Sequence, residues 1–446
     1  MTKFVLLQDL LEYTRDGEWG KGEAGDGLVE MAVIRGTDFA AVRFNDFSSV
    51  PTRYIPASVA ARKKLQPGDI LLETAGGTKD QPTGRTVFLS DRHFSQKNVP
   101  LTCASFSRFL RVKGDLVNPR YFFWYLQSIY ESREMLPYHI QHTGVARFQY
   151  TDFASQWRVP IPNLSYQSAI ADVLGSLDDK IELNRRMNET LEAMAQAIFR
   201  DWFVDFGPTR RKLEGATDPL TIMGGLVKDA ERAQALADLF PAAFGDDGLP
   251  AGWKTVELAE SFDSVMGQSP PGTSYNESGN GLPFFQGRRD FGFRFPQRRV
   301  YCTAPGRIAE ENWTLISVRA PVGDVNRTKE RCCIGRGVGA IIHKQKLTSL
   351  TYYTILELKP LLARFDGDGT VFGSINQKQV RSLPVIFASF EIMREFETLV
   401  SPMDELIRTR SEEIETLAAT RDLLLPKLMS GEIRLSEAEY LMEAAQ

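Results

Sequence analysis

Arginines, glycines and two adjacent cysteines lie together in residues 316–341, ISVRAPVGDVNRTKERCCIGRGVGAI. Such residues serve three kinds of chemistry: a loop that cradles phosphate, a knuckle that binds zinc, and a basic surface that binds a polyanion. No GxxxxGK[ST] occurs, and no helix start follows the glycine cluster. Cys332 and Cys333 lack the two-residue gap that lets two thiolates reach one zinc ion, and His343 makes no partner spacing. We therefore expect no metal site and interpret the cysteines as small residues of a strand.

The segment from Gln286 to Arg336 is strongly basic inside an acidic chain. The net charge of −4 and the pI of about 5.8, taken globally, argue against a nucleic-acid binder. Charge acts locally, however, because salt screens it beyond roughly 8–10 Å. From charge alone, a polyanion-reading surface and a solvated face are equally good interpretations. The basic residues are Arg288, Arg289, Arg294, Arg298, Arg299, Arg307, Arg319, Arg327, Lys329, Arg331 and Arg336, and the acidic ones are Asp290, Glu310, Glu311, Asp324 and Glu330.

The sequence shows no catalytic constellation. No HExxH occurs, and Ser269-Pro270-Pro271 lacks the acidic or amide residue that amino-methyltransferases present to an extruded base. Asp178, Asp179 and Asp404 fall on predicted helices, where we expect them to face solvent. The histidines form no triad-like set; they are His93, His139, His142 and His343.

The elements that must position these residues come from a repeat. KFVLLQDLLE (3–12) aligns with KTVELAESFD (254–263) at an offset of 251. The same offset pairs Gly36 of RGTDF with Gly287 of QGRRDF. It also pairs Gly84-Arg85 with Gly335-Arg336.

Farther along, the offset shrinks, as expected if the second copy lost a loop. Residues 144–162 match 369–387 with Pro160 opposite Pro384, and a helical stretch then matches at an offset of 226. A repeat unit near 200 residues indicates a duplicated domain. A duplicated chain without catalytic groups is typical of a binder with two similar sites.

Each half contains a strand-like region followed by a helical region. About 160 residues are strand-like, with short helices expected at 119–134 and 349–362. Each half then ends in residues at alternating spacings of four and three, which predicts a helix with a coiled-coil seam. Pro402 should start or kink the second of these helices. The seam positions are Ile170, Leu174, Leu177, Ile181, Asn184, Asn188, Leu191, Ala195, Ile198 and Trp202, and then Met403, Ile407, Arg410, Ile414, Leu417, Arg421, Leu424 and Leu428.

Two equal seams in one chain are expected to pack on each other. Asn184, Asn188, Arg410 and Arg421 would interrupt the apolar interface, where buried polar groups can fix register. A helix of about 35 residues spans roughly 50 Å, or about one and a half turns of B-DNA, so the pair could set a distance. The alternative is a plain helical hairpin that holds two domains together.

The cysteine count and hydropathy favour a cytoplasmic protein. Only four cysteines occur, and they suggest no disulfide framework. No apolar run approaches the ~20 residues of a membrane span, and acidic residues interrupt the N-terminal stretch too early for a signal peptide. We therefore expect no membrane association.

Five long stretches carry a family resemblance. They are 161–208 (IPNLSYQSAIADVLGSLDDKIELNRRMNETLEAMAQAIFRDWFVDFGP), 264–292 (SVMGQSPPGTSYNESGNGLPFFQGRRDFG), 317–326 (SVRAPVGDVN), 333–341 (CIGRGVGAI) and 421–433 (RDLLLPKLMSGEI). With them the chain resembles, over nearly its whole length, the specificity subunit of type I restriction–modification enzymes. The first and last stretches look like the family's central and distal conserved regions, and the others look like its second target-recognition domain.

The resemblance implies a function without catalysis by this chain. Such subunits read the two halves of a split DNA target with two domains, and two antiparallel helices act as the ruler between them. They recruit two adenine methyltransferase subunits, which bind S-adenosylmethionine, and in the full enzyme two translocase–nuclease subunits. This chain is then expected to bind double-stranded DNA and no cofactor of its own. A stand-alone or orphan DNA-binding protein and a non-DNA assembly scaffold are the alternatives.

The expected fold class is α+β. Two similar target-recognition domains are separated by two long antiparallel coiled-coil helices, in a pseudo-two-fold internal repeat. The boundaries are 1–160 and 250–387 for the recognition domains, 161–206 and 388–433 for the helical spacers, 207–249 for a linker, and 434–446 for a tail.

Base contacts need long polar side chains, such as Arg for guanine and Asn or Gln for adenine. Residues kept in both copies, such as Asp38 with Asp290, are expected to be structural, and Arg85 with Arg336 to serve shared architecture or phosphate binding. TRDGEWGKGEAGDG (14–27) stands where the second copy has its SPP stretch. The candidates are Gln286, Arg288, Arg289, Arg319, Arg336, Asn376, Gln377 and Lys378 in the second half, and Arg35, Lys79, Gln81, Arg85, Arg147, Gln149 and Tyr150 in the first.

Overall fold

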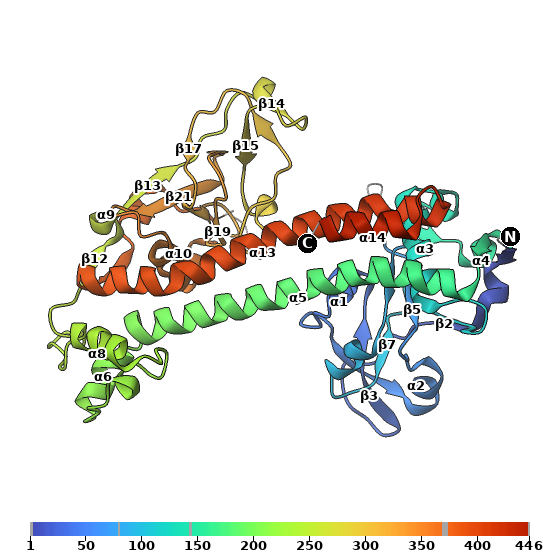
Figure 1. Ribbon diagram of the computed structural model, residues 1–446, viewed down its shortest axis with the longest axis horizontal. Coiled ribbons are helices and arrows are strands. Elements are labelled where there is room, and N and C mark those ends of the chain that lie inside the picture. The colour runs from blue at the N-terminus through green and yellow to red at the C-terminus, as the bar shows by residue number, and fades with distance from the viewer. Residues whose placement is uncertain (1–2, 79–80, 142–144, 368–372, 445–446) are drawn as a thin grey trace. The chain divides into compact units, whose positions relative to one another are not determined.

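The computed structural model describes residues 3–78, 81–141, 145–367 and 373–444, drawn in Figure 1. The chain forms two compact units. The first unit comprises Met1–Arg186 and Arg410–Gln446, and the second comprises Met187–Thr409. Each unit therefore contains a share of two long helices, α5 (Leu164–Phe203) and α13 (Phe390–Ser430).

The two long helices pack together inside each unit, side by side in Figure 1. In the first unit, Leu177 of α5 lies in one buried cluster with Leu424 of α13. In the second unit, the ring centroid of Phe199 lies 5.5 Å from that of Phe396. Most seam positions predicted from the sequence are buried, which confirms the apolar faces. The prediction that Pro402 starts the second helix is wrong, because α13 begins at Phe390.

Polar groups interrupt the packed face, as the sequence predicted. The Asn184 side chain donates to Oε2 of Glu413 at 2.9 Å. Nη1 of Arg421 pairs with Oδ1 of Asp178 at 2.6 Å. Residue numbers rise on one helix as they fall on the other, so the helices run antiparallel in this unit.

Two sheets form the body of the first unit. β3 and β7 pair in parallel, and the other pairings in these sheets are antiparallel. One sheet has the order β2-β8-β5-β6 and the other β4-β3-β7. The bounds are β1 Lys3–Leu6, β2 Leu11–Asp16, β3 Leu28–Ile34, β4 Thr52–Pro56, β5 Ile70–Glu73, β6 Thr86–Phe88, β7 Leu101–Cys103, β8 Ser107–Val112, β9 His139–Ile140, β10 Arg147–Phe148 and β11 Arg158–Ile161, with helices α1 Phe39–Arg43, α2 Ala57–Lys63, α3 Pro119–Glu131, α4 Tyr150–Gln156 and α14 Leu435–Ala444.

The second unit repeats this plan. Its sheets have the orders β13-β21-β18-β19 and β14-β16-β15-β20-β17, and β15 and β20 pair in parallel as β3 and β7 do. Cys332 and Cys333 lie in β20, as predicted. The bounds are β12 Lys254–Glu257, β13 Phe262–Met266, β14 Tyr275–Asn276, β15 Leu282–Phe285, β16 Tyr301–Cys302, β17 Ile308–Ala309, β18 Thr314–Ser317, β19 Val325–Arg327, β20 Cys332–Ile334, β21 Val338–His343 and β22 Pro384–Phe387, with helices α9 Leu258–Ser261, α10 Thr348–Glu357, α11 Lys359–Leu362 and α12 Gln377–Arg381.

Strand register tests the sequence alignment of the two copies. β1 pairs with β11 through Val5 and Val159, and β12 pairs with β22 through Val256 and Val385. The offset of 251 is thus confirmed at the start of the copies. At their end the matched strands differ by 226, so the pairing of Pro160 with Pro384 is wrong by two residues.

The alignment of Gly84-Arg85 with Gly335-Arg336 is also wrong. Gly84 precedes β6 and donates its N–H to the carbonyl of Glu73, and Gly323 precedes β19 and donates to that of Ser317. Both have a positive φ, of 107° and 92° respectively. Gly84 therefore corresponds to Gly323, and Arg85 to Asp324. The matched strand ends Glu73 and Ser317 already differ by 244 rather than 251, and the loop after β5 is longer than the loop after β18. An offset of 251 therefore overshoots the true partner.

Residues 207–249, assigned to a linker by composition, form helices α6 (Gly207–Leu213), α7 (Pro219–Ile222) and α8 (Ala230–Leu239). These helices pack against the end of α5, where Trp202 meets Phe240 edge-on with 5.1 Å between ring centroids. The segment is thus part of the core of the second unit.

Buried carboxylates on the long helices bind arginines from the sheet-bearing part of each unit. Asp178 of α5 is 6% exposed and accepts from Nε of Arg43 at 2.8 Å. Asp404 of α13 is 5% exposed and pairs with Arg294 and, at 2.7 Å, with Arg327. The expectation that these aspartates face solvent is wrong, because both are buried against arginines that lie 77 to 135 residues away in sequence.

The ion pairs Arg43–Asp178 and Arg294–Asp404, which we call the anchors, correspond residue by residue. Arg43 and Arg294 lie 251 positions apart, and Asp178 and Asp404 lie 226 apart, which are the two offsets of the repeat. Each arginine also lies over aromatic rings of a matching helix. The Arg43 guanidinium carbon is 5.2 Å from the ring centroid of Trp124 on α3, and that of Arg294 is 3.5 Å from Tyr352 on α10.

We predict that Asp404→Asn destabilises the protein strongly. Arg294 is 1% exposed and Arg327 is also buried, so loss of the carboxylate charge leaves cations without full compensation. Breaking such a buried pair costs about 3–5 kcal/mol. Urea unfolding followed by tryptophan fluorescence measures the change. The control is Glu330→Gln, which removes the exposed pair with Arg298 and should cost less than about 1 kcal/mol. Equal losses for the two variants would contradict the anchor.

Candidate nucleic-acid interface

Several loops of the first unit leave its four-stranded sheet at the same end of the strands. Asp16 pairs with Arg108, and Glu73 pairs with Ser107, so β2 and β5 end where β8 begins. Antiparallel pairing places these strand ends at the same edge. The loops 17–27 and 104–106 and the described residues of 74–85 leave the sheet there, and an isolated bridge from Ala75 to Arg147 adds the segment before α4. We call these loops and residues 147–150 the first loop edge.

The first loop edge contains a hollow of about 480 Å³. Arg147, Gln149 and Phe106 line it, and Phe106 is 57% exposed. Arg108 pairs with Asp16 at 2.8 Å, and its guanidinium carbon lies 4.2 Å from the Tyr150 ring centroid. The hollow thus presents cationic, amide and aromatic groups beside the carboxylates of Asp16 and Asp152, and the first three are groups that contact nucleic-acid bases and phosphates.

The second unit has an equivalent edge. Met266 pairs with Gly339, and Ser317 with Val338, so β13 and β18 end where β21 begins. The loops 267–274, 318–324 and 335–337 leave the sheet there, and an isolated bridge joins Arg319 to Ser374. We call these loops, Gln286–Arg289 and residues 374–378 the second loop edge.

A glycine starts the equivalent loop in each unit. A Cβ on Gly17 would lie 2.0 Å from the carbonyl oxygen of Cys103, and one on Gly267 would lie 2.1 Å from that of Gly335. The next residues, Glu18 and Gln268, donate their N–H groups to the carbonyls of Cys103 and Ile334. The prediction that residues 14–27 occupy the place of the SPP stretch is therefore confirmed.

The structure brings the second-half candidates together on the second loop edge. Arg288 pairs with Asp324 at 2.6 Å, and Asn376 uses its Oδ1 to accept from the N–H of Gln379 at the start of α12. The remaining candidates are exposed, and within the described residues their side chains have no polar partner. They are Gln286, Arg289, Arg319, Arg336, Gln377 and Lys378.

Most other cations of the basic segment are already paired. Arg298 pairs with Glu330 at 2.5 Å, and Arg331 pairs with Glu310 at 3.2 Å. Arg294 and Arg327 bind Asp404 inside the unit. The local excess of positive charge at the surface is therefore smaller than the sequence indicated.

The first-half candidates divide into paired and exposed side chains. Nε of Arg35 donates to Asp38 at 2.9 Å, and Nε of Arg85 donates to Glu73 at 2.9 Å. The Tyr150 ring lies beneath Arg108. Gln81, Arg147 and Gln149 are exposed, and Lys79 lies outside the described residues.

Asp38 and Asp290 are structural, as predicted. Both are buried, at 2% and 3% exposed. Asp38 accepts from the backbone N–H of Arg35, and Asp290 accepts from that of Gln286. Although burial alone would raise it, hydrogen bonds to Arg35 hold the pKa of Asp38 below its usual value.

Sequence reasoning missed Phe106 and Arg108. Both follow β7, in a short stretch that carries no turn motif or charge cluster. Only strand pairing shows that Ser105-Phe106 occupies the place of Arg336-Gly337 between the two matched strands. No signal in the sequence alone identified these two positions.

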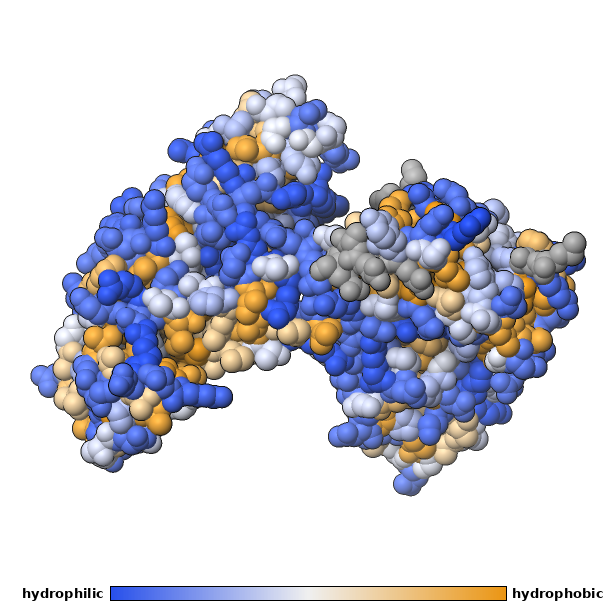
Figure 2. Space-filling view, in the orientation of Figure 1, coloured by the Kyte–Doolittle hydropathy of each residue, from blue (hydrophilic) through white to orange (hydrophobic). Residues whose placement is uncertain are grey.

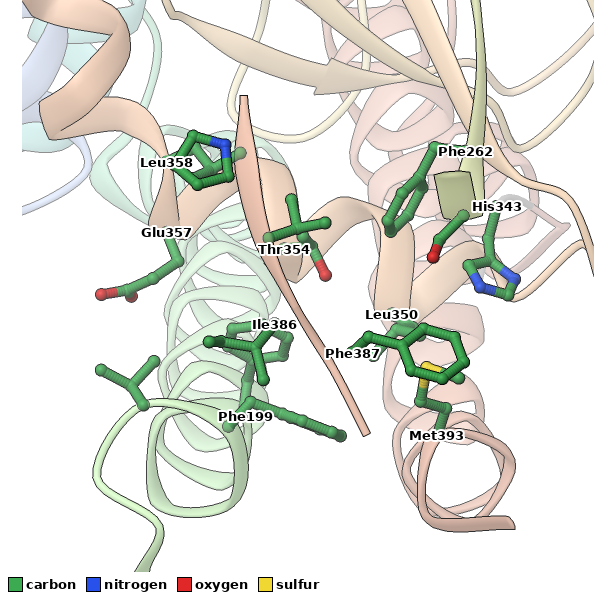
Figure 3. A pocket seen from close by; sticks show the side chains of 15 residues that line it. Phe199, Phe262, His343, Leu350, Thr354, Glu357, Leu358, Ile386, Phe387 and Met393 are labelled. Carbon is green, nitrogen blue, oxygen red and sulfur yellow. The ribbon is translucent and has the colours of Figure 1, made fainter. Parts of the chain in front are cut away.

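A second hollow, of about 100 Å³, lies in the second unit (Figure 3). Phe199 of α5, Leu350 and Leu358 on and after α10, and Ile386 and Phe387 of β22 line it. The lining is mainly apolar, and we assign no chemistry to it.

The buried histidines do not fit a role as acid–base groups near neutral pH. Burial lowers the pKa of His93 to about 4 and that of His343 to about 4. His142 lies outside the described residues. Among the residues that are described, no cluster of His, Cys, Asp and Glu is arranged to hold a metal ion, and no helix could cross a membrane.

Apolar side chains are exposed on the helices as well. Figure 2 shows hydrophobic patches over α6–α8 and along α5. Leu213 of α6 is 63% exposed, and Met187 and Met194 of α5 are 37% and 48% exposed. Leu406 of α13 is also exposed in this unit. Such side chains mark surfaces that partner proteins can cover.

The fold and the two loop edges define a class of protein: a duplicated binder with long helices and two equivalent but chemically different surfaces. The family described as Type I restriction modification DNA specificity domain matches residues 61–193 and 250–416, more than half of the chain. The chain belongs to this family.

Relatives agree with this assignment. The putative type I restriction enzyme MjaX specificity subunit of Methanocaldococcus jannaschii is 29% identical over 282 residues, which cover 62% of this chain and 60% of that protein, less than two thirds of its length. The HindI specificity subunit of Haemophilus influenzae is 26% identical over 331 residues, covering 63% and 70%. The crystal structure of a type I restriction–modification system S subunit from M. genitalium has a similar fold, with a TM-score of 0.56 at 15% identity and 96% of each chain covered.

The histidines predict how stability depends on pH. Below about pH 6.5 the unfolded chain binds protons at His93 and His343, whereas the folded chain binds them only near pH 4. The free energy of unfolding should therefore fall as pH drops from 6.5 to 4, by up to roughly 3 kcal/mol for each histidine. Urea unfolding across this range measures it. His343→Gln should reduce the slope, and an unchanged slope would contradict the assignment.

Proposed function

We propose that the chain is the sequence-specific DNA-binding subunit of a type I restriction–modification complex and reads a bipartite target. The observation that carries the proposal is the pair of loop edges. The same backbone frame carries Arg147, Gln149 and Phe106 in the first unit but Ser374, Asn376 and Gly337 in the second. Equal frames with unequal polar side chains suit the reading of two different half-sites in double-stranded DNA.

The long helices are the proposed ruler between half-sites, as an antiparallel coiled coil with pseudo-two-fold symmetry. α5 has 40 residues and α13 has 41. A helix of that length spans about 60 Å, or somewhat less than two turns of B-DNA. Buried polar pairs such as Asn184 with Glu413 support a fixed register, because sliding would leave them unpaired.

Partner subunits supply the catalysis in this proposal. Two adenine methyltransferase subunits, each with its own S-adenosylmethionine, and in a full enzyme two translocase–nuclease subunits would act on the bound DNA in the cytoplasm. The chain itself performs no catalytic step and holds no cofactor. Exposed Met187, Met194 and Leu406 in the second unit, and Leu183 and Leu423 in the first, support helix faces that such partners cover.

Methylome sequencing tests the function directly. The chain is expressed with its adenine methyltransferase partner in a host that lacks other adenine methylation. One split motif, with a fixed spacer between two half-sites, should become methylated. Methylation without a motif would contradict sequence reading, and a co-purified complex with no DNA preference would favour an assembly scaffold.

We predict that a matched heptad deletion shortens the spacer. Removing residues 185–191 from α5 and 405–411 from α13 keeps the seam in phase and leaves the Asn184–Glu413 and Arg294–Asp404 contacts in place. Each helix loses about 10 Å, so the methylated motif should lose roughly three base pairs of spacer while both half-sites stay the same. Deletion from one helix alone is the control and should abolish methylation. Altered half-site bases, or an unchanged spacer, would rule out the ruler.

A further inference from the structure

Each loop edge carries one arginine at the same isolated bridge. In the first unit the bridge joins Ala75 to Arg147, and in the second it joins Arg319 to Ser374. Ala75 and Arg319 stand two residues beyond the ends of the matched strands β5 and β18. The arginine therefore lies on the segment before α4 in one unit and on the loop after β18 in the other.

The repeat alignment conceals this equivalence. Arg147 corresponds to Ser374, because Arg147 lies three residues before the start of α4 and Ser374 lies three residues before the start of α12. Arg319 corresponds to Ala75 for the reason just given. A position-by-position comparison thus pairs each arginine with a small residue, although the bridge brings both arginines to equivalent places.

The two bridge arginines are exposed, and within the described residues neither is paired with a carboxylate. Other arginines of the edges are neutralised: Arg85 by Glu73, Arg108 by Asp16 and Arg288 by Asp324. An arginine held by a backbone bridge and free at its guanidinium can bind a fixed bidentate acceptor. Arg289 and Arg336 also lack partners among those residues, but no such bridge holds their backbone.

The surroundings of Arg147 favour a base over a phosphate. Phe148 between Arg147 and Gln149 is buried, so the two exposed side chains leave the extended segment on the same side. Both line the hollow that also contains Phe106. Guanine presents two acceptors to an arginine in the major groove, and a neighbouring amide suits an adjacent base.

We propose that Arg147 and Arg319 are the guanine-reading residues of this chain, one for each half-site. The inference rests on the proposed function and assigns specificity within it. Each guanidinium donates two hydrogen bonds to O6 and N7 of one guanine, and the bridge fixes the direction from which it approaches.

The experiment uses the assembled methyltransferase complex with Arg147→Lys, Arg147→Gln, Arg319→Lys or Arg319→Gln, and reads the methylome. Lysine keeps the positive charge but loses the planar fork. Each Arg147 variant should relax one guanine of one half-site, with a roughly ten- to hundred-fold loss of preference at that position. Each Arg319 variant should do the same in the other half-site only.

The control is Arg158→Gln, an exposed arginine on β11 of the small β1–β11 sheet, and it should leave the motif unchanged. A phosphate contact would instead give lower methylation at all sites, rescued by lysine, with an unchanged motif, and this would overturn the proposal. So would an unaltered motif in all four variants, or a change of both half-sites by one substitution. A wild-type complex without a split motif would instead remove the proposed function itself.

Discussion

The structure of each unit depends on buried carboxylates of the long helices that bind arginines, and in the second unit Glu192 of α5 shares Arg294 with Asp404 of α13. A carboxylate and a guanidinium that are both taken out of water are tolerable only when they compensate each other. Asp178 meets this condition through Arg43, and Asp404 through Arg294. The arginine also lies over the aromatic side chains of α3 or α10, so one cluster joins the helix pair, the segment after β3 or β15, and the helix that covers the sheets. Apolar packing alone would permit these elements to slide, whereas a buried ion pair has one geometry.

Because the anchors and the strand ladders fix the frame, the loop edges are free to differ in side chains. Backbone groups hold the edges: Gly84 and Gly323 close the same turn, and Glu18 and Gln268 make the same backbone hydrogen bond. None of these contacts depends on the side chains that point outward. Arg85 can therefore become Asp324, and Ser105 can become Arg336, without a change of fold. This separation of frame from surface is what the proposed reading of two unlike half-sites requires.

The sequence predicted the elements that depend on local pattern. Apolar spacing located both long helices, and a short aromatic run located α3. Asp38 and Asp290 were identified as structural because they recur in both copies. Long-range partners were beyond reach: nothing near Asp178 in sequence indicates Arg43, so the aspartate was expected in solvent. The match of Gly84 with Gly335 failed because loop lengths differ between the copies, and only hydrogen-bonded register reveals where the extra residues lie. Phe106 has no sequence signal at all.

Charge shows most clearly why composition is a poor guide to this surface. The basic segment contains eleven cationic residues by sequence, yet Arg294 and Arg327 form buried ion pairs with Asp404. Arg298, Arg299 and Arg331 form ion pairs with acidic side chains. What a polyanion meets is set by the cations that lack an acidic partner among the described residues, and Arg319 is one of these in the basic segment. Long-range attraction would be weak for a chain of net charge −4, because salt screens charges beyond about 10 Å. In the proposed function, selectivity for DNA comes from short-range hydrogen-bond geometry at the two loop edges, which an arginine with a fixed backbone can provide and a diffuse positive patch cannot.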